Sequence, residues 1–145
     1  MKIKKLKVLA RNTLFYILAT TLIFAFTECS RKITFKSSSV VPAATGHVKV
    51  KRNSNNNYVI QVDVSNLAEV SQLTPPKQTY VVWMVSEQQD TKNLGQIVSS
   101  NKLNASFETS TASKPIKIFI TAENDPTAYY PTEPIVLTTE NFWDK

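Results

Sequence analysis

Residues 79–86 read TYVVWMVS, an apolar run of strand length that is rich in the β-branched and aromatic residues preferred in β-sheets. Because both alternating sets of positions are apolar, we expect a central strand that is covered on both faces. Trp83, with Val81 and Val85 two residues to either side, is expected to point into the core. The run therefore predicts the middle of an all-β domain.

Short β-rich runs separated by polar turns lie on both sides of this strand. No stretch after residue 44 shows helical periodicity of useful length. The expected strands cover residues 47–51, 58–64, 79–86, 94–99, 104–109, 115–122 and 135–139. About seven short strands at this spacing are typical of an immunoglobulin-like antiparallel β-sandwich, which we expect over residues 45–145.

The N-terminal segment has the layout of an export signal. Residues 2–11 hold five basic side chains, and residues 13–27 form an apolar run without charge. This run of roughly 15 residues is shorter than the about 20 that a spanning helix needs. We therefore expect a helical signal peptide over residues 1–28. The alternative is an uncleaved signal anchor, which could still span with the help of its flanking charges.

Cys29 is the only cysteine and stands at the end of the apolar run. The segment resembles the signal peptides of bacterial lipoproteins, in which a cysteine after the hydrophobic stretch is lipidated and becomes the mature N-terminus. This resemblance implies that acyl chains on Cys29 hold the protein on a membrane of the bacterial cell envelope. We expect residues 29–44, which include a serine run, to combine the lipidated cysteine with a flexible linker.

Two later segments resemble the extracytoplasmic domain of anti-sigma-K-factor proteins. Residues 80–99, YVVWMVSEQQDTKNLGQIVS, are similar to that family's Tyr-x-x-Trp strand, polar turn and Leu-Gly, and residues 120–137, ITAENDPTAYYPTEPIVL, are similar to its closing segment. The likeness spans roughly Gly46 to Thr139 and implies an immunoglobulin-like sandwich in an envelope setting. It implies no anti-sigma activity, because only residues 1–12 precede the apolar run.

Candidate catalytic and metal-binding groups are few. A single histidine, His47, and a single cysteine exclude a Cys/His zinc site, and we expect the histidine to be exposed on the first strand. With Gly46 and Gly95 as the only glycines, a glycine-rich phosphate loop is excluded. Residues 123–125 supply fewer oxygens than calcium needs, and we interpret them as turn residues before Pro126. We expect no enzyme activity, cofactor or metal.

An exposed apolar patch is the one candidate binding site. With Trp83 facing the core, Val82 and Met84 lie on the outer face of the same sheet. In immunoglobulin-like topology the strands at 79–86 and 115–122 are neighbours, which places Phe119 beside them. Val82, Met84 and Phe119 then form a candidate protein-binding patch. The alternative is that other parts of the chain, such as Phe142, cover this face.

The charge distribution argues against nucleic-acid binding. The chain carries a formal charge of +6, and loss of the leader before Cys29 would leave about +2. Basic Arg31 and Lys32 favour a periplasm-facing position over the cell surface. The sequence therefore predicts a non-enzymatic, lipid-anchored cell-envelope protein that acts through protein or surface interactions with an unidentified partner. The alternative is a single-pass, signal-anchored sensory or regulatory protein.

Overall fold

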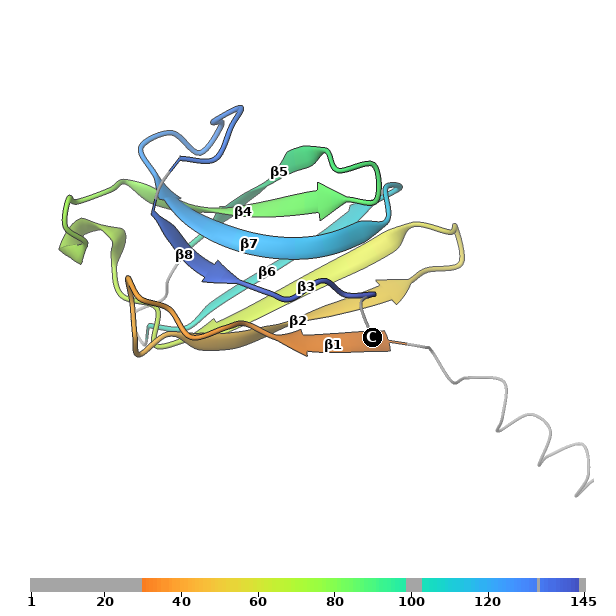
Figure 1. The fold of residues 1–145 in the computed structure, drawn as a ribbon, viewed down its shortest axis with the longest axis horizontal. Helices are drawn as coiled ribbons and strands as arrows, with labels where there is room; N and C mark the ends of the chain where they lie inside the picture. Colours follow the sequence, from red (N-terminus) through yellow and green to blue (C-terminus); the bar gives the residue numbers. More distant parts are fainter. Residues whose placement is uncertain (1–29, 99–102, 133, 144–145) are drawn as a thin grey trace, which may run out of the picture.

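The structure, a computed structural model, describes residues 30–98, 103–132 and 134–143. These residues form two antiparallel four-stranded sheets that pack face to face, as Figure 1 shows. The strands are β1 (Ser30–Thr34), β2 (Thr45–Arg52), β3 (Tyr58–Ser65), β4 (Thr79–Ser86), β5 (Thr91–Ile97), β6 (Ala105–Thr111), β7 (Pro115–Glu123) and β8 (Ile135–Thr138). The first sheet has the order β1-β2-β3-β6 and the second β5-β4-β7-β8. The prediction of an all-β fold is confirmed.

Alternation of apolar and polar residues predicts β2, β3 and β6 of the first sheet, but not β1. In β3, Ile60, Val62 and Val64 are buried between the sheets, whereas Asp63 is exposed. Successive side chains of a strand point to opposite faces, so this pattern identifies one buried and one solvated face. The turn at residues 53–57 is built from asparagines, and the Asn53 side chain accepts hydrogen bonds from the backbone nitrogens of residues 55 and 57.

The segment before residue 45 differs from the expected flexible linker. Ser30–Thr34 form β1, which pairs antiparallel with β2 so that Ser30 lies opposite Lys51. Phe35 and Val41 are buried in the core that the two sheets share. The sandwich therefore includes residues 30–44. Sequence alone did not reveal β1, because this five-residue strand holds a single apolar residue, Ile33, and so shows no hydrophobic alternation.

The central strand β4 faces the opposite way from the prediction. Val82 and Met84 are fully buried in the core between the sheets, whereas Trp83 lies on the outer face. The cause is the pairing of β4 with β7, in which Val82 lies opposite Ile120 and Met84 opposite Ile118. Residues directly opposite each other in a ladder share a face, so the isoleucines of β7 bring both residues into the core. The predicted adjacency of these two strands is confirmed.

Candidate functional site

The β7–β8 loop, described over residues 124–132 and 134, lies over part of the outer face of the second sheet. Trp83 and Phe119 lie beneath it with their ring centroids 6.3 Å apart and their planes inclined by 13°. Ala128 of the loop packs against this cluster, and Trp83 is fully buried. Phe119 thus faces outward as expected, but it is only 7% exposed.

The predicted patch of Val82, Met84 and Phe119 is therefore wrong as an exposed surface. Its first two members lie between the sheets, and the third is covered by Trp83 and the loop. The physical reason is that a strand with apolar residues on both faces needs cover on both, and the β7–β8 loop supplies the second cover.

A series of buried hydrogen bonds holds the C-terminal end of this loop, at Thr132, on the sheet. The Trp83 indole nitrogen donates to Thr121 Oγ1 at 2.8 Å, and Thr121 Oγ1 donates to Glu123 Oε1 at 2.5 Å. Thr132 closes the chain: its backbone nitrogen donates to Glu123 Oε1 at 2.8 Å, and its hydroxyl donates to Glu123 Oε2. Glu123 is only 2% exposed, and its carboxylate accepts hydrogen bonds from Thr121 of β7 and from Thr132 of the loop.

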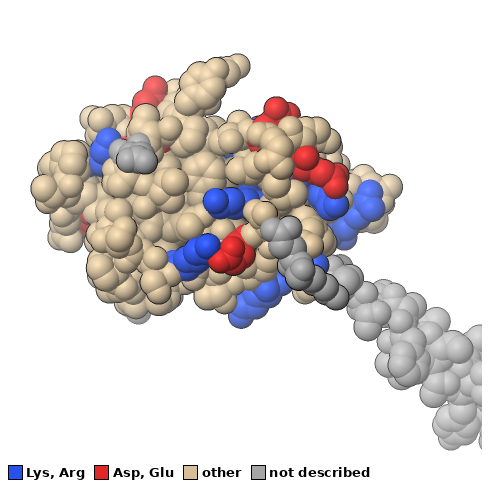
Figure 2. Space-filling view, viewed as in Figure 1, with Lys and Arg blue, Asp and Glu red and all other residues tan. Residues whose placement is uncertain are grey.

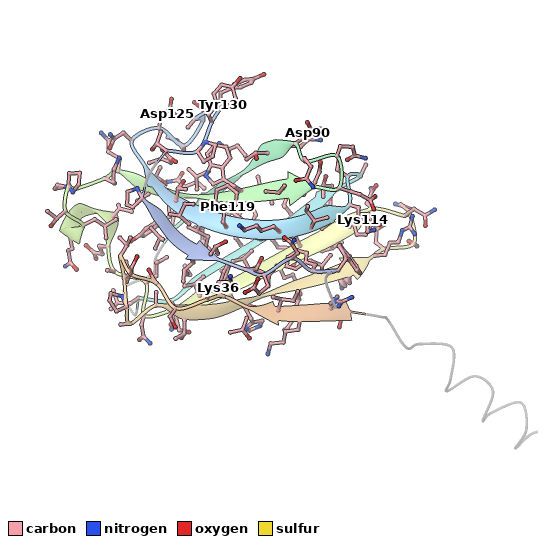
Figure 3. All side chains as sticks on the ribbon, in the orientation of Figure 1. Lys36, Asp90, Lys114, Phe119, Asp125 and Tyr130 are labelled. Carbon is pink, nitrogen blue, oxygen red and sulfur yellow. The ribbon has the colours of Figure 1, made fainter. Side chains whose placement is uncertain are left out.

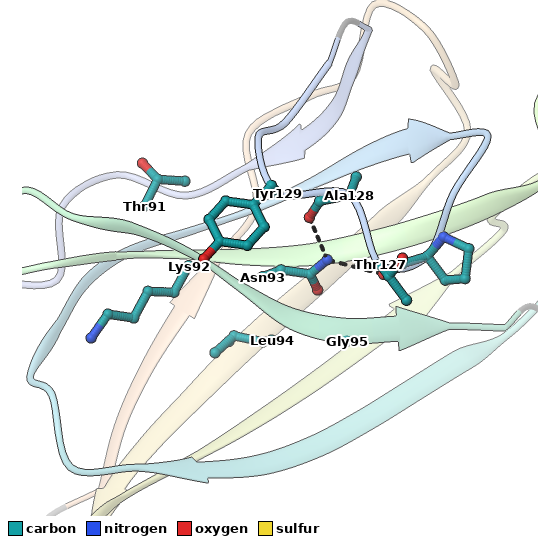
Figure 4. Close-up of a pocket in the computed structure, with 9 residues that line it drawn as sticks. Thr91, Lys92, Asn93, Leu94, Gly95, Thr127, Ala128 and Tyr129 are labelled. Carbon is teal, nitrogen blue, oxygen red and sulfur yellow. Dashed lines mark hydrogen bonds between the residues drawn. The ribbon is translucent and has the colours of Figure 1, made fainter.

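Hydrogen bonds from Asn93 of β5 hold the N-terminal half of the loop. Asn93 Nδ2 donates to the backbone oxygens of Pro126 and Ala128, both at 3.0 Å (Figure 4). Asp125 Oδ1 accepts two hydrogen bonds from Thr127, one from its Oγ1 at 2.7 Å and one from the Thr127 backbone nitrogen at 2.8 Å. The hydrogen bond from the Thr127 side chain, with that from its backbone, lowers the pKa of the Asp125 carboxyl. Asp125 thus closes a turn, as its position before Pro126 predicts.

Two adjacent tyrosines stand at the crest of the fastened loop. Tyr129 is 86% exposed and Tyr130 76% exposed, and their ring centroids are 5.7 Å apart in an edge-to-face arrangement. Figure 2 shows the loop projecting from the surface, and Figure 3 places Tyr130 at its outermost point. We name this pair and the loop that carries it the tyrosine crest.

An open groove of about 600 Å³ runs between the tyrosine crest and β5. Figure 4 shows Tyr129 above Lys92 and Asn93, and Leu94 lines the floor. The groove offers an aromatic ring, an ammonium group and hydroxyls, which are groups for binding by stacking and hydrogen bonding. The sequence-based predictions assigned no role to Tyr129 and Tyr130. The signal for them was two successive tyrosines between Pro126 and Pro131.

The remaining candidates of the sequence lie elsewhere. His47 is half-buried rather than exposed, with Nε2 3.4 Å from Asp63 Oδ2. Cys29 and the expected signal peptide lie outside the described residues. Within residues 30–98, 103–132 and 134–143, no three His, Cys, Asp or Glu side chains are grouped so that they could hold a metal ion. In the same ranges, no helix has the length and apolar character needed to cross a membrane.

Comparison with known proteins adds no relative. No protein-family model matches the chain, and no characterised protein matches it significantly. The resemblances to bacterial lipoprotein signals and to anti-sigma-K ectodomains stay predictions.

Proposed function

We propose that this chain is a lipid-anchored, non-enzymatic protein of the bacterial cell envelope that recognises a protein partner through the tyrosine crest. The main support for this recognition surface is that Tyr129 and Tyr130 are exposed on a loop that hydrogen bonds hold at both ends. Tyrosines supply a large contact area at a low cost in conformational entropy, and a loop held in advance loses less entropy on binding. A fastened loop with two solvated aromatic rings therefore suits recognition.

The strand order supports an immunoglobulin-like topology. In the constant-type immunoglobulin fold, the first, second and fifth strands share one sheet, and the third, sixth and seventh share the other. Counted from β2, the strands of this chain divide in the same way, with β5 joined to the second sheet and β1 added to the first. Folds of this class commonly present binding loops on a stable sandwich.

Membrane attachment is proposed through Cys29. The residue directly precedes β1, and it follows an apolar run with a basic start. Mass spectrometry of the protein isolated from bacterial membranes tests this. A mature chain that begins at acylated Cys29 is expected, and Cys29→Ala should abolish both the acyl mass and processing at that point. An intact chain from Met1 to Lys145 would contradict the lipid anchor and favour the signal-anchored regulatory protein.

Site-specific photocrosslinking in cells tests the tyrosine crest. A benzophenone amino acid at position 130 is expected to give a discrete protein adduct, and the additional change Tyr129→Ala should reduce its yield severalfold. Ser110, exposed on the other sheet, is the matched control position. The same adducts at positions 130 and 110, or an adduct at 130 that is insensitive to Tyr129→Ala, would contradict recognition by the crest.

A further inference from the structure

The end of the sandwich nearest Cys29 combines several turns with the start of β1. Ser30, the first residue of β1, is bonded to Cys29 and pairs with Lys51 at the end of β2. The turns after β2, β4 and β6 lie at the same end, since Tyr58 pairs with Thr111 and Val85 with Thr91. We name this surface the basal end: residues 30–31, 51–58, 85–92, 111–117 and 143. It forms the right-hand end of the molecule in Figure 1.

No spacer separates the basal end from the proposed anchor. Because β1 begins one residue after Cys29, an acyl group on that cysteine would hold the basal end within a few ångströms of the bilayer surface. An uncleaved anchor ending at the same place would do so as well. Because no flexible linker intervenes, the fold itself would determine which surface of the domain faces the headgroups.

Trp143 lies at this end beside Arg31 of β1 and Lys114 of the turn between β6 and β7. The Arg31 guanidinium carbon is 5.0 Å from the centroid of the Trp143 ring, and Lys114 Nζ is 5.1 Å from it. The indole nitrogen donates to the backbone oxygen of Pro115 at 2.7 Å, and the residue remains 39% exposed. A partly exposed indole beside cationic side chains is the combination that occurs at the headgroup level of membranes.

The charges of the described residues are distributed unevenly along the molecule. The basal end carries the cations Arg31, Lys51, Arg52, Lys92, Lys114 and Lys117 against the carboxylates Glu87 and Asp90. Glu87 pairs with Lys114 at 2.7 Å, so part of this charge is neutralised. Towards the opposite end, the charged side chains are Lys36, which pairs with Glu140, and Asp63, Glu69, Lys77, Glu123 and Asp125. Figure 2 shows Lys and Arg side chains at the right-hand end and across the middle of this face, with acidic side chains along the upper rim at the right.

We propose that the basal end is a membrane-facing surface that sits on the anionic headgroups of the bilayer, with Trp143 at headgroup depth. The inference rests on the proposed membrane attachment and adds the orientation of the domain. Basic side chains close to a membrane are attracted to anionic lipids, and this attraction is screened by salt. The tyrosine crest then lies apart from the headgroups, since Figure 3 shows Tyr130 and Lys114 well separated on the molecule.

Tryptophan quenching in vesicles tests this orientation with the full chain. The chain has two tryptophans, and Trp83 is fully buried, so quenching by lipids brominated near the headgroup reports on Trp143. In vesicles of phosphatidylcholine with about 30% phosphatidylglycerol we expect about twofold stronger quenching than in phosphatidylcholine alone, and loss of the difference in about 1 M salt. Trp143→Phe should remove the quenchable signal.

Paired charge variants separate this surface from the overall charge of the domain. Arg52→Gln with Lys114→Gln lowers the net charge of the basal end from +4 to +2 and should remove about half of the dependence on phosphatidylglycerol. Lys36→Gln with Lys77→Gln removes the same charge away from the basal end and also breaks one ion pair, that of Lys36 with Glu140, so it should leave this dependence unchanged. Both variants should retain the circular dichroism spectrum of the parent chain.

The outcomes distinguish the orientation from the anchor. Suppose that the chain floats with the vesicles. If its tryptophan quenching is then the same with and without Trp143, or the same in both lipid mixtures, the membrane-facing basal end is overturned and the anchor is not. A chain that does not float would overturn the anchor and, with it, the seating on the bilayer.

Discussion

Glu123 holds the β7–β8 loop on the sandwich, and we expect its replacement to release the tyrosine crest. The carboxylate accepts hydrogen bonds from the Thr121 hydroxyl and from both the backbone nitrogen and the hydroxyl of Thr132. Glu123→Ala removes all three acceptor contacts. Glu123→Gln preserves the shape and leaves one oxygen for two of the donors.

The expected cost differs between the two variants. A buried donor that loses its acceptor costs about 1–3 kcal/mol. In Glu123→Ala the fully buried Thr121 hydroxyl bears this cost in full, whereas Thr132 can partly recover by turning to water when the loop opens. We therefore expect a loss of about 3 kcal/mol in the free energy of unfolding. In Glu123→Gln the amide can donate to the Thr132 hydroxyl, which turns to accept, so we expect about 1 kcal/mol.

Equilibrium unfolding in urea, in mild detergent and followed by the fluorescence of buried Trp83, measures both costs. Thr132→Val is the matched control, because it removes one donor and keeps the backbone contact, and it should cost about 1 kcal/mol. The crosslink from position 130 should weaken in Glu123→Ala and persist in Glu123→Gln. A Gln variant as unstable as the Ala variant, or an Ala variant that loses less than about 0.5 kcal/mol, would refute the reasoning from hydrogen-bond geometry.

Three further variants test the core, the alkaline limit and the close approach of two strands. Val82→Asp places an unpaired charge between the sheets and should lower the free energy of unfolding by more than about 4 kcal/mol. Val98→Asp is the control at a site that is 68% exposed, and in the same urea unfolding it should change the free energy by no more than about 0.5 kcal/mol. Equal effects would contradict the observed facing of β4. Burial raises the pKa of the Tyr80 hydroxyl from its usual value of about 10 to about 12, so the folded chain keeps a proton that the unfolded chain releases. Stability should therefore fall between about pH 10 and pH 12, by at most about 1.4 kcal/mol per pH unit, and Tyr80→Phe should flatten that slope in unfolding measured across the range; an unchanged slope would show that other groups cause it. Gly46→Ala would place a Cβ atom 2.4 Å from the backbone oxygen of Asp63, so we expect a loss of about 2–3 kcal/mol, and a melting temperature like that of the parent chain would disprove the close contact.

Local sequence determined the fold class and most of the strands. Hydrophobic alternation over residues 58–64 and the apolar run over residues 79–86 are patterns of neighbouring residues, and they suffice to place strands because side-chain direction repeats every two residues. The asparagine-rich turn at residues 53–57 was predictable for a similar reason, since Asn side chains close turns through their own neighbouring backbone.

Tertiary structure alone decided which face of β4 lies inside and where the candidate site stands. Alternation in β4 cannot distinguish two apolar faces, and the pairing of Val82 with Ile120 settles the matter across 38 residues of chain. The link from Trp83 through Glu123 to Thr132 likewise joins residues that no local pattern connects. Such contacts depend on strand register and loop closure. Many weak interactions across the whole fold determine both, and no property of a short segment does.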